Sequence, residues 1–495
     1  MASQAAGTLL ERPDQFFIGG EWIAPSSDAM FDVISPSTEQ LFVRVAEAQA
    51  VDLERAVAAA RKAFDEGPWP RLTHAERAEY LRAMAAEIRR RAETIGTVWT
   101  SEIGVASWMS GQIGSMVAET FDYYADLATS FSWVEQHEPR YSPGAAAGYL
   151  VREPVGVVGA IVPWNGALGM SAWKCAPALL AGCTVILKAS PESPGGPLQL
   201  AEVAQAVGLP AGVFNVLTAD RAVSELLVRH SGVDKISFTG SSVAGKRIGA
   251  LCGERVARCT LELGGKSAGV ILDDYDVEEA ARHIATYAPV LSGQVCSSLT
   301  RLVVSRHRHD RFADALSSAF REIKVGDPFA AETMMGPLAM ERQRARVEDF
   351  IAKGRAEGAK VAAGGGRPQH LERGFFIEPT VFANVDNDMT IARQEIFGPV
   401  VSIIPAESEE DAIAIANDSP FGLNASVFTN DADRAFQVAR QLKAGTVGHN
   451  WFRTDFSIGF GGFKQSGIGR EGGVEGLHPF LESKTVILDG IPTRI

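Results

Sequence analysis

The sequence predicts an α/β protein built from two doubly wound, Rossmann-like α/β lobes and a small β arm. From residue 148 onward, short runs rich in β-branched residues alternate with amphipathic stretches. That order is typical of a parallel sheet with helices on both faces. A second series of the same kind begins after LELGG (261–265). At roughly 150 residues per domain, the chain of 495 residues has room for two to four domains.

The region before the first series is predicted to be helical. Apolar residues recur at helical spacing among charged ones over 51–66 and 73–95, and a third helix is expected near 107–131. Asp52 and Thr73 are the expected N-caps, because both side chains can accept a hydrogen bond from a free backbone N–H of the first turn.

The two lobes are predicted element by element. In the first, strands at 157–163, 184–189, 213–217 and 235–239 precede helices near 168–181, 197–207, 220–230 and 243–252. In the second, strands are expected near 268–272, 300–305, 359–363, 399–404 and 424–428, with helices near 277–291, 308–322, 339–357, 409–417 and 431–442.

Two segments fit neither lobe: the hydrophilic stretch 132–147 and the tail KTVILD (484–489). We expect the tail to form a strand that pairs with a strand elsewhere, in this or another subunit. The predicted domains are a first lobe of 1–131 and 148–261, a second of 262–472, and an arm of 132–147 and 473–495.

Composition excludes several classes of protein. Hydrophobic residues make up 46% and charged residues 22%, which is ordinary for a soluble globular protein. The net charge of −13 argues against nucleic acid or an anionic membrane as a partner. No apolar stretch approaches the ~18–20 residues needed to span a bilayer, and the N-terminus lacks the pattern of a secretory signal. Five widely spaced cysteines without a CxxC suggest neither disulfides nor a metal site, so we expect a cytoplasmic protein without a metal.

Two motifs suggest nucleotide binding but fail on context. GIGREG (467–472) matches GxGxxG, yet no buried strand precedes it. GSSVAGKR (240–247) nearly matches a P-loop, but Arg247 stands where a P-loop needs a hydroxyl for magnesium. What remains is a helix N-terminus opened by Gly240 and Ser241, whose free N–H groups can hold a phosphate.

Four separated segments carry residue types suited to one reactive centre. Cys296 lies in SGQVCSSLTR (292–301), just before a strand, and Glu262 ends an apolar strand in LELGGKS (261–267). Asn165 leaves a strand in VPWNG (162–166), and EIFGPV (395–400) places an acid and an aromatic before a turn. Taken singly, each segment is as readily a turn as a site.

Together, PWN, LELGGKS, GQVC and EIFGP occur in an order and spacing that resembles the NAD(P)-dependent aldehyde dehydrogenase superfamily. The resemblance runs from FIGGEW (about residue 17) to GGFKQSGIGRE (461–471). It implies a cofactor-binding lobe, a catalytic lobe and an oligomerisation arm made of 132–147 and the C-terminal strand. It also implies a homodimer or homotetramer.

The resemblance implies a role for each catalytic residue. The Cys296 thiolate attacks the aldehyde, and the oxyanion is held by the Asn165 amide and the backbone N–H of Cys296. After hydride transfer to the nicotinamide, Glu262 activates the water that hydrolyses the thioester, so the acid is released without coenzyme A. Since a free thiol titrates near ~8.5, the site is expected to favour the anion. Lys174 is expected to have a supporting role near the nicotinamide.

The cofactor is expected to be NAD, with NADP possible. The resemblance places Lys188 at the adenosine ribose, Ser241 at the pyrophosphate and Glu395 at the nicotinamide ribose. The full set expected at the cofactor is Val162, Trp164, Lys188, Ser190, Glu192, Gly240, Ser241, Leu263, Glu395 and Phe397. Many members carry a glutamate three residues after the lysine. Here that place is Pro191 and Glu192 follows, which favours weaker discrimination between NAD and NADP.

The substrate tunnel is expected to be lined by Gly166, Met170, Trp173, Trp451 and Phe460. Its aromatic residues favour an apolar aldehyde, whereas Arg453 facing the tunnel would favour an anionic one. Two other classes of function remain open: a cysteine hydrolase that pairs Cys296 with a histidine and uses no nicotinamide, and a non-catalytic oligomeric scaffold that binds no NAD.

Overall fold

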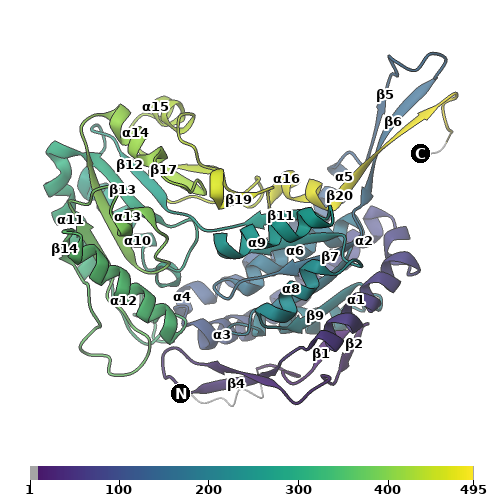
Figure 1. Ribbon diagram of the computed structural model, residues 1–495, viewed down its shortest axis with the longest axis horizontal. Coiled ribbons are helices and arrows are strands. Elements are labelled where there is room, and N and C mark those ends of the chain that lie inside the picture. The colour runs from purple at the N-terminus through teal and green to yellow at the C-terminus, as the bar shows by residue number, and fades with distance from the viewer. Residues whose placement is uncertain (1–8, 494–495) are drawn as a thin grey trace.

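The computed structural model describes residues 9–493, so the outermost residues of the predicted first lobe and arm lie outside the described part. Figure 1 shows two sheet-centred lobes side by side and a long β arm that projects away from them. The architecture agrees with the fold class predicted from the sequence.

The first lobe contains an eight-stranded sheet in the order β19-β11-β10-β7-β8-β9-β1-β2. Its strands are β1 (Phe16–Ile18), β2 (Glu21–Ile23), β7 (Val157–Ile161), β8 (Thr184–Ala189), β9 (Phe214–Thr218), β10 (Lys235–Thr239), β11 (Arg258–Glu262) and β19 (Gly467–Ile468). The central five, from β11 to β9, are parallel. Strands β7, β8 and β9 are buried throughout, which explains why apolar residues predominate in their sequences. The short N-terminal strands were not predicted.

Helices cover both faces of this sheet: α1 (Ala50–Asp65), α2 (His74–Arg90), α3 (Ala92–Ile103), α4 (Ser107–Ser110), α5 (Ile113–Ser130), α6 (Ala167–Ala181), α7 (Gly195–Ala206), α8 (Arg221–Arg229) and α9 (Ser242–Glu254). A two-stranded hairpin of β3 (Met30–Ile34) and β4 (Leu41–Ala46) lies beside them.

Three local predictions in this region were wrong. The helix expected over 73–95 breaks at Arg91, whose backbone leaves helical geometry while its side chain pairs with Glu87 and Glu202. The helix expected over 107–131 breaks between α4 and α5. Thr73 is an N-cap as predicted, but Asp52 is not: Gln49 is the N-cap, and Asp52 accepts the Gln49 N–H from the third helical position.

The second lobe contains a seven-stranded sheet in the order β14-β15-β16-β13-β12-β17-β18, in which only β14 is antiparallel. The strands are β12 (Ser267–Ile271), β13 (Leu299–Ser305), β14 (Lys360–Ala363), β15 (Thr380–Ala383), β16 (Val400–Ala406), β17 (Asn424–Phe428) and β18 (Thr446–His449). The helices are α10 (Val277–Tyr287), α11 (His309–Arg321), α12 (Glu341–Ala356), α13 (Thr390–Arg393), α14 (Glu409–Asn417) and α15 (Ala432–Ala439). Strands β15 and β18 were not predicted.

The projecting arm is a three-stranded antiparallel sheet in the order β20-β6-β5, formed by β5 (Val134–His137), β6 (Ala147–Pro154) and β20 (Leu481–Leu488). The tail pairs with β6 of its own chain, with Leu488 opposite Ala147 and Leu481 opposite Pro154. Most of β6 therefore belongs to the arm, although the sequence boundary at 148 placed it in the first lobe. A short helix, α16 (Gly473–Leu477), precedes β20.

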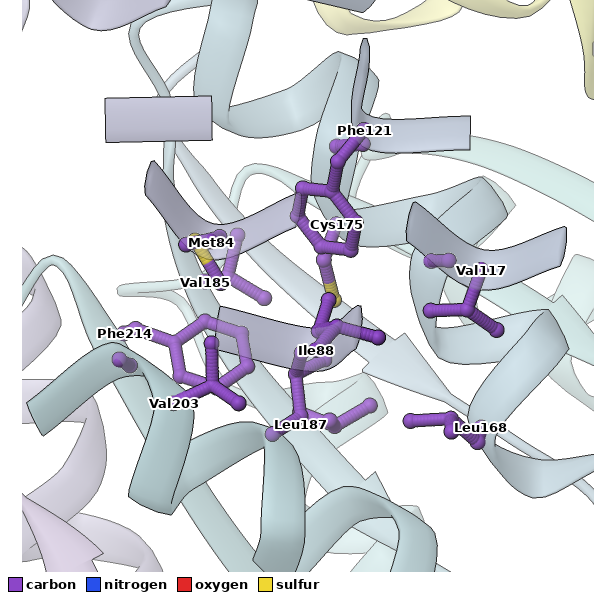
Figure 2. Close-up of a cluster of buried hydrophobic side chains, with 14 of the residues drawn as sticks. Met84, Ile88, Val117, Phe121, Leu168, Cys175, Val185, Leu187, Val203 and Phe214 are labelled. Carbon is purple, nitrogen blue, oxygen red and sulfur yellow. The ribbon is translucent and has the colours of Figure 1, made fainter. Parts of the chain in front are cut away.

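A large apolar core fixes the first lobe. Figure 2 shows side chains that meet between the sheet and four helices: Met84 and Ile88 of α2, Val117 and Phe121 of α5, Leu168 and Cys175 of α6, Val203 of α7, and Val185, Leu187 and Phe214 of the sheet. Truncating one such side chain to Ala typically costs about 2–5 kcal/mol. Residues of β7, β8 and β9 all belong to this core. Within the described residues, no helix is long and apolar enough to cross a membrane.

Candidate active site

The carboxyl ends of four neighbouring parallel strands carry the predicted site residues. The strands β11, β10, β7 and β8 lie side by side, and they end at or just before Glu262, Gly240, Asn165 and Ser190. Ligands of open α/β sheets bind at this edge. The sheet order thus brings residues far apart in the sequence to one face of the first lobe.

The segment that carries Cys296 has an unusual backbone. Leu291, Ser292 and Gly293 have φ values of 49°, 53° and 71°, which lie in the left-handed region. The Ser292 hydroxyl contacts the carbonyl oxygens of Gly336 and Pro337 at 2.8 and 3.0 Å. A Cβ on Gly293 would lie 2.4 Å from the Gly398 carbonyl carbon. Strain that is held by many contacts is typical of a functional segment.

Asn165 and the segment Gly264–Gly265 pack directly against this loop. The Asn165 side-chain amide donates to the Gln294 carbonyl at 2.9 Å, two residues before Cys296. A Cβ on Gly265 would lie 2.3 Å from the Cys296 carbonyl oxygen, so only glycine permits this approach. The fourth segment, EIFGPV, also meets them, because Gly398 contacts Gly293 and Glu395 accepts from the Gly265 N–H. The structure therefore brings together all four predicted segments.

The Cys296 thiol is not ionised by its protein surroundings. Burial raises the pKa of Cys296 to about 12, with further increases from the negative charges of Glu395 and Glu262. The backbone N–H groups of Cys296 and Ser297 lower the pKa of the thiol, but by less than burial and the two carboxylates raise it. Burial and the two carboxylates thus disfavour the thiolate in the protein without a bound cofactor, and the expectation that the site favours the anion stays a prediction for the complex with NAD.

Glu262 is a buried carboxyl group without a hydrogen-bond partner for either oxygen among the described residues. Burial raises its pKa well above the usual value, and the nearby Glu471 raises it further, whereas Lys174 and Arg470 oppose the shift. A Cβ on Gly461 would lie 2.7 Å from Glu262 Oε1, so a glycine leaves room for the carboxyl group. A carboxyl group with a raised pKa is suited to act as a general base.

Lys174 lies beneath the site and is fully buried. It pairs with Glu471 and donates to the Thr239 hydroxyl at 2.7 Å. The Ser237 hydroxyl also donates to Glu471, at 3.2 Å. The sequence prediction did not include Glu471. This residue lies in GIGREG (467–472), where only the spacing of the glycines was considered.

The adenosine side of the expected cofactor site centres on Lys188, at the end of β8. Burial lowers the pKa of Lys188 to about 8, although Glu192 and Asp220 oppose the shift. Glu192 accepts from the Ser190 hydroxyl and pairs with Arg342 of α12. Burial tends to raise the pKa of Glu192, but these two partners outweigh it and the net pKa is lowered. Sequence reasoning did not identify Arg342, which belongs to the other lobe.

The N-terminus of α9 supplies the expected phosphate site. Ser241 is the N-cap and accepts from the Ala244 N–H at 3.3 Å. The N–H of Gly240 donates to the Glu262 carbonyl at 2.9 Å. A Cβ on Gly245 would lie 2.4 Å from the Leu263 side chain, so a glycine lets α9 pack closely on the sheet. The first turn of a helix leaves backbone N–H groups without partners inside the helix, and such groups suit an anion.

The nicotinamide side contains Glu395 in a buried setting. Burial raises the pKa of Glu395, while a hydrogen bond from the Gly265 N–H at 3.0 Å opposes the shift. Phe397 has a φ of 62° and packs edge-on against Trp164, with ring centroids 5.4 Å apart. Val162, just after β7, donates to the Lys188 carbonyl at 3.3 Å.

A cavity of about 370 Å³ lies between α5, α6 and the segment 454–457. Its lining comprises Ile113, Met116, Val117, Glu119, Thr120, Tyr123, Gly169, Trp173, Thr454, Asp455, Phe456 and Ser457. Trp173 stacks on Phe456 at 3.5 Å between centroids, and Phe460 packs behind both.

Of the predicted tunnel residues, only Trp173 lines this cavity. Trp451 instead bonds to Tyr287 and packs on His283 of α10. Arg453 donates to the His449 carbonyl and does not line the cavity. Gly166 lies beside Met170, near the start of α6. The cavity residues on α5 were missed because nothing in the sequence places that helix beside Trp173.

Comparisons with known proteins give one answer. The model of the aldehyde dehydrogenase family matches residues 22–486. The chain is 41% identical to geranial dehydrogenase of Castellaniella defragrans, covering 96% of this chain and 98% of that protein. It is 40% identical to betaine aldehyde dehydrogenase of Brucella canis, covering 96% of each chain.

Solved structures agree with this result. A Mycobacterium tuberculosis aldehyde dehydrogenase complexed with NAD+ superposes with a TM-score of 0.93 at 43% identity, over 96% of this chain and 98% of that one. A Staphylococcus aureus betaine aldehyde dehydrogenase in complex with NAD+ gives 0.95 at 37% identity, over 99% and 98%. These matches also account for the positions of Cys296, Glu262 and Asn165 at one edge of the first lobe. The chain belongs to the aldehyde dehydrogenase family.

Proposed function

We propose that this enzyme oxidises an uncharged aldehyde to the free carboxylic acid with NAD, using Cys296 as nucleophile and Glu262 as base. The observation that carries the proposal is the unpartnered, buried carboxyl group of Glu262 close to the Cys296 segment. Burying a carboxyl group without a hydrogen bond costs free energy. Such groups are concentrated at sites where a side chain accepts and releases protons during catalysis.

In the first step, the Cys296 sulfur forms a bond to the aldehyde carbon, the C=O π electrons move to oxygen, and the thiol proton passes to solvent. Asn165 is held by Gln294, and its amide together with the N–H of Cys296 supports the oxyanion. Removing one such donor typically lowers the rate by about 10²–10³. When bound, NAD+ supplies the hydride acceptor and a positive charge that favours the thiolate.

In the second step, the acyl group is a thioester on Cys296. Glu262 accepts a proton from water as the water oxygen attacks the thioester carbon. The C–S bond then breaks, the acid leaves and the Cys296 thiolate is regenerated. Burial is the main reason that the pKa of Glu262 is raised. The buried pair beside it adjusts that shift, because Glu471 raises the pKa further and Lys174 lowers it.

The residues at the sheet edge fit NAD. The capped N-terminus of α9 suits the pyrophosphate, and Gly245 lets the helix pack closely against Leu263. Glu395 and Lys188 offer partners to the two riboses. Because Glu192 is engaged by Ser190 and Arg342, it repels a 2′-phosphate only weakly. We therefore propose that NAD is preferred and that NADP is also used.

The cavity lining supports an apolar aldehyde over an anionic one. Its walls are largely apolar and aromatic, and its charged members are the carboxylates of Glu119 and Asp455. No Lys or Arg lines it, since Arg453 points elsewhere. A substrate that carries a second carboxylate would meet like charge there.

The proposal extends to assembly and location. The arm sheet leaves β5 and β20 as edges, which supports a homodimer or homotetramer. Five cysteines without a disulfide support a cytoplasmic location.

One assay tests the proposed reaction. NADH formation is followed by absorbance across a panel of aldehydes, with and without coenzyme A. We expect turnover with apolar aldehydes, no requirement for coenzyme A, and poor turnover with aldehydes that carry a carboxylate. A requirement for coenzyme A would exclude hydrolysis by Glu262. Hydrolase activity without nicotinamide, or a failure to bind NAD, would instead favour one of the two alternative classes.

A further inference from the structure

Helix α3 contacts two parts of the site, although the proposed reaction assigns it no role. Near its C-terminal end, Glu102 is 1% exposed and has no cationic partner among the described residues. Its carboxyl oxygens accept from the Ser193 hydroxyl and from the Gly195 N–H, both at 2.8 Å. A buried carboxyl group held only by neutral donors is unusual, and it calls for an explanation.

The bonds of Glu102 reach the adenosine side of the cofactor site. The Ser193 N–H donates to the Ser190 carbonyl at 3.2 Å, and the Ser190 hydroxyl donates to Glu192. Glu102 thus lies beneath the turn that carries both predicted cofactor residues, Ser190 and Glu192. A Cβ on Gly195 would lie 2.8 Å from Glu102 Oε1 and 2.4 Å from the Val98 side chain, so the turn sits tightly on α3.

The same helix also contacts the catalytic loop. The Trp99 indole N–H donates to the Asn165 carbonyl at 3.3 Å. Next to this contact, a Cβ on Gly196 would lie 2.8 Å from Leu168 Cβ, so the starts of α6 and α7 are packed together. Trp99 and Glu102 are three residues apart and share a face of the helix.

We propose that α3 positions both halves of the site, with Glu102 fixing the cofactor turn 190–195 and Trp99 fixing the backbone of Asn165. The inference rests on the proposed function, because it assumes that these segments bind NAD and stabilise the oxyanion. Both are positioning residues, since each acts through the segment that it holds.

The protonation state of Glu102 determines the best substitutions. Burial raises the pKa of Glu102 to about 8, although the bonds from Ser193 and Gly195 oppose the shift. The group is therefore largely protonated at neutral pH, and glutamine reproduces its shape and one donor. Leucine has a similar size and offers no acceptor, so Glu102→Leu leaves the Ser193 hydroxyl and the Gly195 N–H without a partner.

The experiment separates cofactor binding from catalysis. NAD binding is measured by calorimetry without aldehyde, and kcat is measured at saturating NAD. Glu102→Leu should weaken NAD binding by about tenfold with kcat changed less than about twofold. Glu102→Gln should bind NAD within about twofold of the unmodified enzyme. Trp99→Phe should show the opposite split, with kcat lowered about tenfold and NAD binding unchanged.

Two further variants keep the test decisive. Ser101→Ala is the matched control: Ser101 lies next to Glu102, is also buried, and bonds back to the Thr97 carbonyl within α3. It should change neither quantity. If Glu102→Leu does not fold, Ser193→Ala removes the same contact from the other side and should weaken NAD binding about threefold.

The outcomes distinguish a failure of the role proposed for Glu102 from a failure of the proposed aldehyde oxidation. A folded Glu102→Leu enzyme that binds NAD normally would overturn the role of Glu102, as would equal losses in Glu102→Leu and Ser101→Ala. If the unmodified enzyme binds NAD but oxidises no aldehyde, the proposed function fails, while the binding data still test the role of Glu102.

Discussion

At the scale of the residue, Cys296 and Glu262 are close but have different tasks, and substitution separates them. Cys296→Ala should abolish turnover and leave NAD binding nearly intact, because in the proposed mechanism the Cys296 sulfur bonds to the substrate carbon. Glu262→Gln should give a burst of NADH followed by a stall at the thioester. The burst survives because removing the Glu262 charge lowers the pKa of the thiol. Rapid-mixing absorbance measures both phases, and normal steady-state turnover of Glu262→Gln would remove Glu262 from its role.

Glu102 should also leave a signature in the pH dependence of stability. Its pKa rises from 4.5 in the unfolded chain to about 8 in the folded one, so the native state binds the extra proton. Stability from this group is complete below about pH 4.5 and is lost as the pH rises through about 8. Melting temperatures of the unmodified enzyme and Glu102→Gln should therefore diverge with rising pH, with the unmodified enzyme losing more. Parallel curves across pH 5–9 would show that Glu102 titrates normally.

Cofactor choice depends on Glu192 and its partner. Because Arg342 neutralises Glu192 from the other lobe, we expect NAD to be preferred and NADP to give measurable activity. Arg342→Gln should lower kcat/KM for NADP by about tenfold and leave that for NAD within about twofold. Lys353 is also an exposed, ion-paired residue of α12. Lys353→Gln is therefore the control and should change kcat/KM for neither cofactor. Strong preference for NADP would contradict the expected NAD preference.

At the scale of the element, the Cys296 segment depends on steric fit as well as on backbone freedom. Gly293 and Gly208 both have positive φ, 71° and 68°, but only Gly293 has backbone atoms within 2.4 Å of a Cβ. Gly293→Ala should therefore displace the segment and lower kcat by more than about 100-fold. Gly208→Ala meets nothing within 4 Å and should cost only about 1 kcal/mol of stability, with normal kcat. Steady-state kinetics and thermal melts measure both, and equal activity of the two variants would contradict this account.

The elements also show what sequence reasoning can reach. Strands β7, β8, β10 and β17 were predicted to within two residues, because each is a short run that contains β-branched or aromatic residues and is followed by an amphipathic helix or a turn. Helix breaks at Arg91 and Gly111 were missed, because tertiary contacts cause them. Cys296, Glu262 and Asn165 were found through motifs. Glu471, Arg342 and the cavity residues of α5 were not, because only folding brings them near the site.

At the scale of the whole molecule, the two lobes and the arm have separate tasks. The first sheet presents its strand ends to a cofactor, and the second lobe supplies Cys296 and Glu395 from the loops that face it. Arg342 and Glu192 join the lobes across this region. The site residues named above come from the two lobes, and none of them lies on the arm.

We expect the arm to hold subunits together, because β5 and β20 leave unpaired edges within the described chain and expose Val134 and Ile487. Light scattering should give two or four times the chain mass of 52.9 kDa. Ile487→Lys places a charge on the exposed face of the arm and should shift the mass toward the monomer. Leu41→Lys, a similarly exposed site on β4 away from the arm (Figure 1), should leave the mass unchanged. A fully active, monodisperse monomer would refute assembly, because a free arm of this length would then stay in solution with both edges unpaired.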